Sequence, residues 1–143
     1  LEKNSSNYYV GKNEVTFKFI VTNKGVGPAI IDDVIYKFGK QKIEGWGLGK
    51  ALKKKHPNLT VEQLGNSGLD GKVLAPEESH TVITEKITRP KGDTTNLSKV
   101  INNLNFNLEY CYCSVYGKCW KVMTETEDNI QPSTDCKFRE NIR

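Results

Sequence analysis

The fold is decided by the stretch Asn105-Phe-Asn-Leu-Glu-Tyr-Cys111-Tyr-Cys113-Ser-Val-Tyr-Gly117-Lys-Cys119-Trp120-Lys-Val122. Apolar or aromatic side chains occupy its even positions on both sides of a short turn. This alternation is typical of strands that bury one face. The stretch therefore predicts an antiparallel β-hairpin.

The register of this hairpin follows from its buried face. If the even positions of both arms face the core, Tyr112 lies opposite Trp120, and Cys113 lies opposite Cys119. The loop between the arms then has three residues and ends at Gly117, where such loops favour a left-handed conformation. The Cα atoms of a non-hydrogen-bonded pair lie about 4.5 Å apart, which permits a disulfide.

The four cysteines are interpreted as a disulfide framework. They allow three pairings, and the register favours Cys113 with Cys119, leaving Cys111 for Cys136. A zinc site would use the same sulfurs, but Cys-x-Cys is tighter than usual zinc spacing, and neither histidine has a ligand-like spacing to the cysteines. A redox-active pair favours Cys-x-x-Cys at a helix N-terminus. We therefore expect an extracytoplasmic protein, in a periplasm or at a cell surface.

The length of 143 residues predicts a single domain over residues 1–143. We expect residues 1–13 to form a loose lead-in and residues 14–126 to form a β-sandwich. A short helical insertion is expected at 47–66. Residues 127–143 are expected to be a C-terminal tail tethered by a disulfide.

The first half of the chain contains two further strand patterns. Residues 15–22 alternate with apolar side chains at odd positions, and the turn that follows contains Gly25 and Gly27, which can supply positive φ. The apolar phase changes within residues 29–38, which predicts a β-bulge near Asp32 and Asp33.

The helical insertion is predicted from a change of period. Leu48 and Leu52 have helical spacing, Pro57 interrupts the pattern, and Val61 with Leu64 suggests a second short helical turn. Strands and Gly/Asn/Pro turns on both sides predict a mainly all-β chain, an immunoglobulin-like antiparallel β-sandwich that carries this insertion.

A family resemblance rests on two parts of the chain. The first part resembles the early strands of bacterial extracytoplasmic immunoglobulin-like domains of the cell-adhesion-related (CARDB) type. It consists of Phe19-Ile-Val-Thr-Asn23-Lys-Gly-Val-Gly27-Pro28-Ala29, followed by an aliphatic strand and Gly39-Lys40. Tyr110-Cys-Tyr-Cys-Ser-Val-Tyr-Gly-Lys-Cys-Trp120 is similar to the last hairpin of small bacterial proteins that carry such a domain after an N-terminal membrane helix. The resemblance implies an outward-facing interaction domain without defined chemistry.

Charge and hydropathy limit the kinds of partner that we expect this chain to bind. The net charge is +4, but lysines greatly outnumber arginines, which argues against nucleic-acid recognition. No window has the roughly 18 consecutive apolar residues of a membrane span, and the first residues do not resemble a signal peptide. We expect contact with a membrane only through a segment upstream of this chain.

Lys50, Lys53, Lys54 and Lys55 form the densest basic patch, which is a candidate site for an anionic surface such as lipid headgroups or acidic wall polymers. The neighbouring stretch Gly45-Trp-Gly47-Leu-Gly49-Lys50 lacks the Ser or Thr that follows the lysine of a phosphate-binding loop.

The sequence offers no convergent catalytic set. Asp32 with Asp33, and Glu77 with Glu78, are adjacent pairs that point to opposite faces of a strand, and the same holds for Ser79-His80. We therefore expect a non-enzymatic interaction module without metal or cofactor, whose partner is an unidentified protein or envelope component. The alternative is a small-ligand or metal-binding domain that uses the groove beside the helical insertion.

Overall fold

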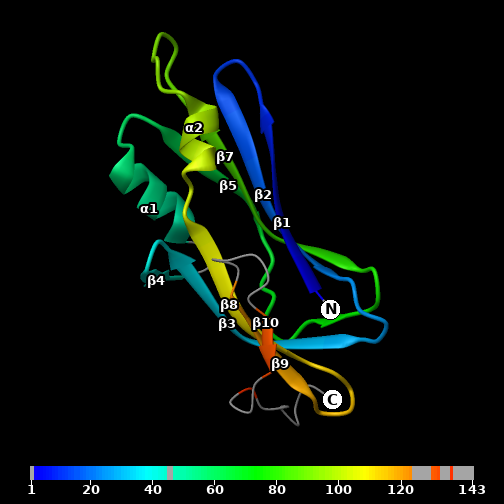
Figure 1. Ribbon diagram of the computed structural model, residues 1–143. Coiled ribbons are helices and arrows are strands. Elements are labelled where there is room, and N and C mark those ends of the chain that lie inside the picture. Colours follow the sequence, from blue (N-terminus) through cyan, green and yellow to red (C-terminus); the bar gives the residue numbers. More distant parts are fainter. Residues whose placement is uncertain (1, 45–46, 124–129, 133–135, 137–143) are drawn as a thin grey trace.

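The chain folds into two antiparallel sheets that face each other, as the computed structural model shows (Figure 1). The structure describes residues 2–44, 47–123, 130–132 and 136. Strands dominate these residues, and the two helices are short. The prediction of a mainly all-β sandwich with a short helix is confirmed.

The first sheet has four strands in the order β1-β2-β7-β5. Their bounds are Glu2–Val10 for β1, Glu14–Asn23 for β2, Ser79–Thr88 for β7 and Thr60–Asn66 for β5. Each neighbouring pair is antiparallel.

The second sheet has the order β10-β9-β8-β3-β4, and β6 also pairs with β3. The strands are β3 (Ala29–Phe38), β4 (Gln41–Ile43), β6 (Val73–Leu74), β8 (Phe106–Cys113), β9 (Cys119–Met123) and β10 (Ile130–Pro132). The helices are α1 (Gly47–Lys55) and α2 (Leu97–Asn102), which lie toward the same end of the sandwich in Figure 1.

The β8–β9 hairpin has the predicted register. Tyr112 pairs with Trp120, and Cys113 pairs with Cys119. Gly117 has a φ of 84°, the left-handed conformation expected at the end of the loop. The rings of Tyr112 and Trp120 stack with centroids 5.1 Å apart, so cross-strand packing reinforces the register.

Aromatic side chains join the two sheets across the core. Phe106 of β8 meets Phe19 of β2 edge to face, with ring centroids 5.4 Å apart, and meets Phe17 at 6.3 Å. Both β2 residues belong to the buried odd positions predicted for this strand. Such edge-to-face contacts are favoured by the ring quadrupole, so they fix the sheets as well as bury area.

The predicted bulge in β3 is confirmed. The register with β8 shifts between Asp32 and Ile35, and Asp33 adopts a positive φ of 54°. The bulge turns the second half of β3 so that Tyr36 packs on Phe106 in the core.

Two expectations for local structure are wrong. Residues 2–10 form β1, which pairs with β2 along its whole length, instead of a loose lead-in. The helical insertion ends at Lys55, and residues 60–66 form β5 instead of a second helical turn. In both cases the open edge of a neighbouring strand supplies backbone hydrogen bonds that outweigh a weak local pattern. The described part of the predicted C-terminal tail is limited to β10 and Cys136; the rest, like Trp46, lies outside the described residues.

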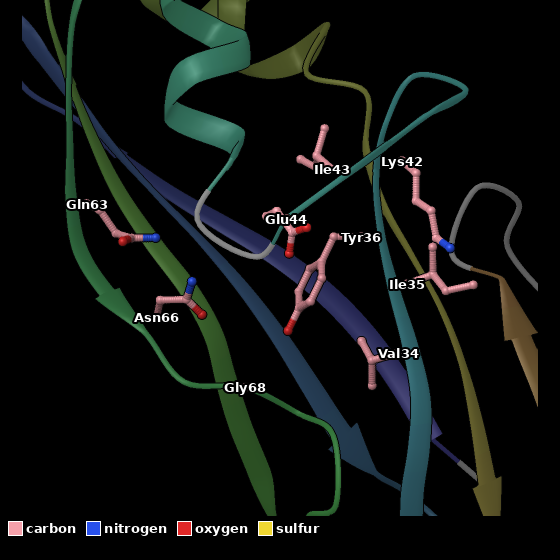
Figure 2. A pocket seen from close by; sticks show the side chains of 9 residues that line it. All are labelled: Val34, Ile35, Tyr36, Lys42, Ile43, Glu44, Gln63, Asn66 and Gly68. Carbon is pink, nitrogen blue, oxygen red and sulfur yellow. The ribbon is translucent and has the colours of Figure 1, made fainter.

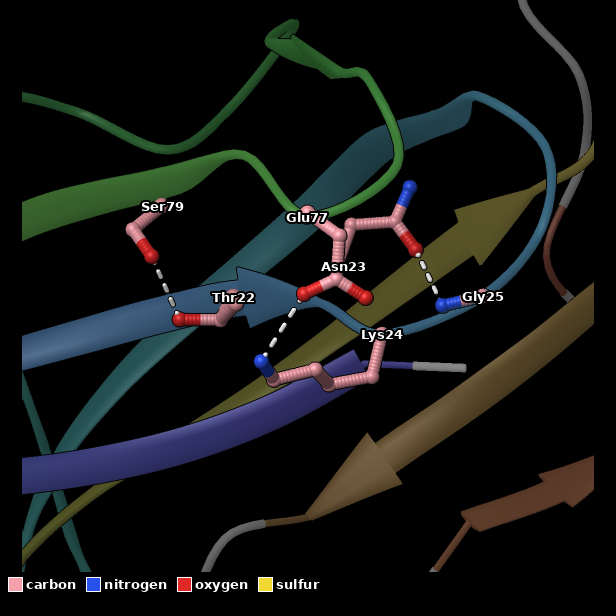
Figure 3. Close-up of polar contacts among 6 residues, drawn as sticks. All are labelled: Thr22, Asn23, Lys24, Gly25, Glu77 and Ser79. Atoms are coloured by element: carbon pink, nitrogen blue, oxygen red, sulfur yellow. Dashed lines mark hydrogen bonds and ion pairs between the residues drawn. The ribbon is translucent and has the colours of Figure 1, made fainter.

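The turn after β2 is closed by a side chain. Neither Gly25 nor Gly27 is among the glycines with positive φ, contrary to expectation. Instead Asn23, which is 1% exposed, accepts a hydrogen bond from the Gly25 amide through Oδ1 at 2.8 Å (Figure 3). Its Nδ2 donates to the carbonyl oxygens of Gly27 and Leu74, each at 2.9 Å. Asn23 thus ties the turn to β6.

Candidate functional site

The basic patch predicted from the sequence lies on α1. Leu48 and Leu52, one turn apart, are buried and hold the helix against the sandwich. The lysines occupy exposed positions, and three of them form the last helical turn: Lys53, Lys54 and Lys55. Positive charge at a helix C-terminus is favoured by the helix dipole, so the patch is compatible with a stable helix.

A carboxyl group is buried below this helix. Glu85 lies on β7 between the buried residues Ile83 and Ile87, and its exposed fraction is 1%. Neither carboxyl oxygen has a hydrogen-bond partner within the described part of the chain. Loss of hydration raises the pKa of Glu85 to about 7.

The backbone of α1 passes close to this carboxyl. A methyl group placed on Gly49 would lie 3.9 Å from Glu85 Oε2 and 3.4 Å from Val61 Cγ1. Both distances are ordinary van der Waals contacts. Glycine at this position therefore lets the backbone of α1 approach the carboxyl closely, and an added methyl group would touch both Glu85 and Val61.

A cavity of about 440 Å³ lies beside this contact. Glu85, Val61 and Gln63 of the first sheet line it from one side, and residues of α1 line it from the other: Gly49, Lys50, Lys53 and Lys54. The cavity is thus the groove beside the helical insertion that the sequence suggested as a ligand site.

A second cavity of about 850 Å³ lies between the open edges of the two sheets (Figure 2). Tyr36 and Glu44 face it from the β3–β4 side, and Gln63 and Asn66 face it from β5. Burial raises the pKa of Tyr36, although a hydrogen bond with the backbone of Leu69 partly opposes this. Gln63 lines both cavities, so they adjoin at β5.

The structure keeps apart the acidic and hydroxyl groups considered from the sequence. Glu77 pairs with Lys24 at 3.0 Å, and Glu78 accepts from the Ala75 amide at 3.0 Å. Ser79 Oγ bonds Thr22 Oγ1 at 2.7 Å, whereas His80 Nε2 bonds the carbonyl oxygen of Ser67 at 2.9 Å. These groups serve separate loop contacts and do not converge on a reacting centre.

The cysteines form two disulfides, Cys111–Cys136 and Cys113–Cys119. The Cα atoms of the second pair are 4.1 Å apart, as expected for neighbours in the ladder. All four residues are buried in a cluster separate from the main core. This is the pairing that the hairpin register favoured, and it places the sulfurs away from the α1 cavity.

Glu85 was not identified from the sequence. Its signal was the alternation of β7, in which the inward positions 83, 85 and 87 carry Ile, Glu and Ile. A charged residue within an apolar series marks either a bulge or a buried ionisable group. Only the packing of α1 over β5 and β7 distinguishes the two.

Comparison with family models, with curated proteins and with solved structures gives no significant match. Among the described residues, no cluster of three or more His, Cys, Asp or Glu side chains could hold a metal ion. No helix in that part of the chain is long and apolar enough to cross a membrane.

The buried carboxyl predicts an unusual pH dependence of stability. The pKa of Glu85 is about 7 in the folded state and that of an ordinary Glu, near 4.3, after unfolding. The folded state therefore binds more protons between these values. The free energy of unfolding should fall by about 3 kcal/mol as the pH rises from about 4 to 8. Urea denaturation at a series of pH values measures this slope.

The Glu85→Gln variant is expected to lose this slope and to be more stable than the parent at pH 8. Glu62→Gln, on the exposed face of β5, is the matched control and should keep it. The charged side chains that line the cavity with Glu85 are Lys50, Lys53 and Lys54. An unchanged slope in Glu85→Gln would contradict the assignment of this proton to Glu85.

Proposed function

We propose that this chain is a non-enzymatic, extracytoplasmic immunoglobulin-like module that binds an anionic partner through the lysines of α1. The chain would belong to a bacterial envelope protein and be tethered by a segment outside the sequence considered. The resemblance to CARDB-type domains supports this assignment at the level of class.

The two disulfides support the proposed extracytoplasmic location. Disulfides persist in oxidising environments and are rare in the bacterial cytoplasm. Both connect residues of the second sheet or its C-terminal extension, so their role is to hold structure. A sandwich stabilised in this way is suited to presenting a binding surface outside the cell.

The observation that carries the proposal is the set of lysines on α1 that form no ion pair with another described residue. The ion pairs found within the described residues use Lys24, Lys37 and Lys86, and none uses Lys50, Lys53, Lys54 or Lys55. Four adjacent positive charges on one short helix attract an anionic polymer or lipid surface, with about 1 kcal/mol per lysine near a membrane.

This function predicts salt-sensitive binding that depends on α1. The parent protein should sediment with phosphatidylcholine vesicles that contain phosphatidylglycerol, or bind soluble polyphosphate, and lose binding as salt rises. The Lys53→Glu/Lys54→Glu variant should bind at least 30-fold more weakly, since about 1 kcal/mol is lost per lysine.

The two probes distinguish a lipid surface from an acidic polymer. Lys118→Glu/Lys121→Glu is the matched control because it makes the same charge change at exposed positions at β9, toward the other end of the sandwich (Figure 1). Equal loss in the control would mean that net charge, not the α1 face, drives binding. Equal sedimentation with pure phosphatidylcholine would overturn the anionic-surface proposal.

A second function, small-ligand binding beside α1, is favoured by a different observation. The cavity lies between α1 and the first sheet, and at its floor is a buried carboxyl without a hydrogen-bond partner among the described residues. A solvated surface patch needs no such group. We therefore propose small-ligand binding in this cavity as a second function, separate from the binding of an anionic partner by the lysines of α1.

A further inference from the structure

The cavity beneath α1 has opposite charges at its floor and its rim. We propose that it binds a small zwitterion, with the ammonium group of the ligand on the Glu85 carboxylate and its acidic group on the lysines of α1. The inference rests on the second function above, ligand binding in this cavity, and names the ligand class.

The Glu85 carboxyl at the floor of the cavity favours a ligand group that donates hydrogen bonds. Glu85 is 1% exposed, and both of its oxygens lack a partner among the described residues. A buried polar group without a partner is costly, and a carboxylate more so than a neutral group. A ligand ammonium group would supply hydrogen bonds and an opposite charge at once, so it recovers more of this cost than a hydroxyl would.

The lysines at the rim of the cavity favour a ligand that also carries an acidic group. Lys50, Lys53 and Lys54 line the cavity from the α1 side, and none belongs to an ion pair recorded for the described residues. A purely cationic ligand would meet three like charges on its way to Glu85. A purely anionic ligand would satisfy the rim and leave the floor unpaired. Only a molecule that carries both groups matches both ends of the cavity.

The wall and the volume limit the ligand to a small aliphatic molecule. Val61 supplies an apolar wall, Gln63 adds one polar group, and Gly49 places no side chain between the cavity and the carboxyl. A volume of about 440 Å³ is at the lower end of typical ligand sites. An amino acid or short amino-acid homologue fits this description.

A series of simple compounds tests the ligand class. Glycine, β-alanine, 4-aminobutanoate and 6-aminohexanoate carry both charges at increasing separation. Butanoate lacks the ammonium group, and butylamine lacks the acid. Binding to the oxidised protein at pH 8 is followed by titration calorimetry and by shifts of backbone amide resonances near Gly49, Val61 and Glu85.

At least one amino acid of the series should bind at least tenfold more tightly than butanoate and butylamine. Glu85→Gln should reduce this preference over butanoate to less than twofold, while Lys53→Ala/Lys54→Ala should remove the preference over butylamine. Gly49→Ala should weaken binding at least tenfold by placing a methyl group against Glu85 and Val61, where the ligand ammonium group must enter. Gly27→Ala, whose added methyl group has no neighbour within 4 Å, should bind like the parent.

The pH profile separates a binding role of Glu85 from a structural one. Below pH 7 the carboxyl must release its proton to solvent before it can pair with the ammonium group, so affinity should fall about tenfold per pH unit. Affinity for the zwitterion should lose this dependence in Glu85→Gln.

The outcomes also test two claims separately: that the ligand is a zwitterion, and that the cavity binds a small ligand at all. Binding of butanoate or butylamine as tightly as the amino acids, with the same resonances shifted, would overturn the zwitterion proposal and leave ligand binding in place. If no compound of the series shifts the resonances near Gly49, Val61 and Glu85, both the zwitterion and the small-ligand function are contradicted.

Discussion

Replacing Cys111 and Cys136 by serine is expected to lower the free energy of unfolding by about 3.5 kcal/mol. The disulfide closes a loop with a sequence separation of 25, so its loss restores much conformational freedom to the unfolded chain. It also leaves β10 joined to the sandwich by its short pairing with β9 alone among the described contacts between strands. Urea denaturation of the oxidised variant measures the loss.

Cys113→Ser/Cys119→Ser is the matched comparison, because it removes the same number of sulfurs from the same cluster. Its loop has a sequence separation of only 6, and the hairpin register already holds its ends together, so the expected loss is about 2 kcal/mol. A larger loss from the short loop than from the long one would contradict the chain-entropy argument and assign the stabilisation to packing within the cysteine cluster.

The hairpin could be predicted because its evidence is local. Alternation, loop length, Gly117 and the cysteine positions all lie within one short stretch and agree on one register. The bulge in β3 was predictable for the same reason, since a change of apolar phase at Asp32 and Asp33 is visible in the strand itself. Where several local signals agree, they determine the local structure, and tertiary packing changes it little.

The candidate site could be predicted only in part because its two halves come from distant segments. The lysines of α1 stand out in the sequence, but Glu85 becomes a buried group only when α1 folds over β5 and β7. The misread turn at Val61 and Leu64 has the same origin. The register of β5 with β7 shifts between Gln63 and Gly65, which produces the spacing that resembled a helix.

The second helix, α2, shows a local signal that was overlooked. Asn96 caps it by accepting a hydrogen bond from the Lys99 amide at 3.1 Å, and the buried residues Leu97, Val100 and Ile101 follow at helical spacing. An N-cap followed by apolar residues at these intervals is a recognised helix start. The helix is only six residues long, so a strand-rich context obscured it.

The buried asparagine at the end of β2 is expected to matter as much as the long-loop disulfide. Asn23 continues the inward odd positions of β2, where an apolar residue would otherwise be expected. Its side chain makes three hydrogen bonds to backbone groups of Gly25, Gly27 and Leu74. Its own backbone also pairs with the turn that precedes β7, through Glu77 and Glu78.

Asn23→Ala should therefore lower the free energy of unfolding by about 3 to 4 kcal/mol, because it leaves three backbone groups without partners and a small void. Thr22→Ala, which removes the neighbouring exposed bond to Ser79, is the control and should cost less than about 1 kcal/mol (Figure 3). Thermal or urea denaturation compares the two variants. Equal losses would mean that the turn is held by its backbone alone.

Asn23→Asp separates hydrogen bonding from side-chain volume. The variant keeps the acceptor for the Gly25 amide but turns a carboxylate toward the carbonyl oxygens of Gly27 and Leu74, which cannot donate. Its stability should recover at low pH, where a protonated carboxyl can donate one of the two lost bonds. A loss of stability that does not change with pH would show that the site tolerates the charge, and the case for Asn23 as the donor that connects the turn to β6 would fail.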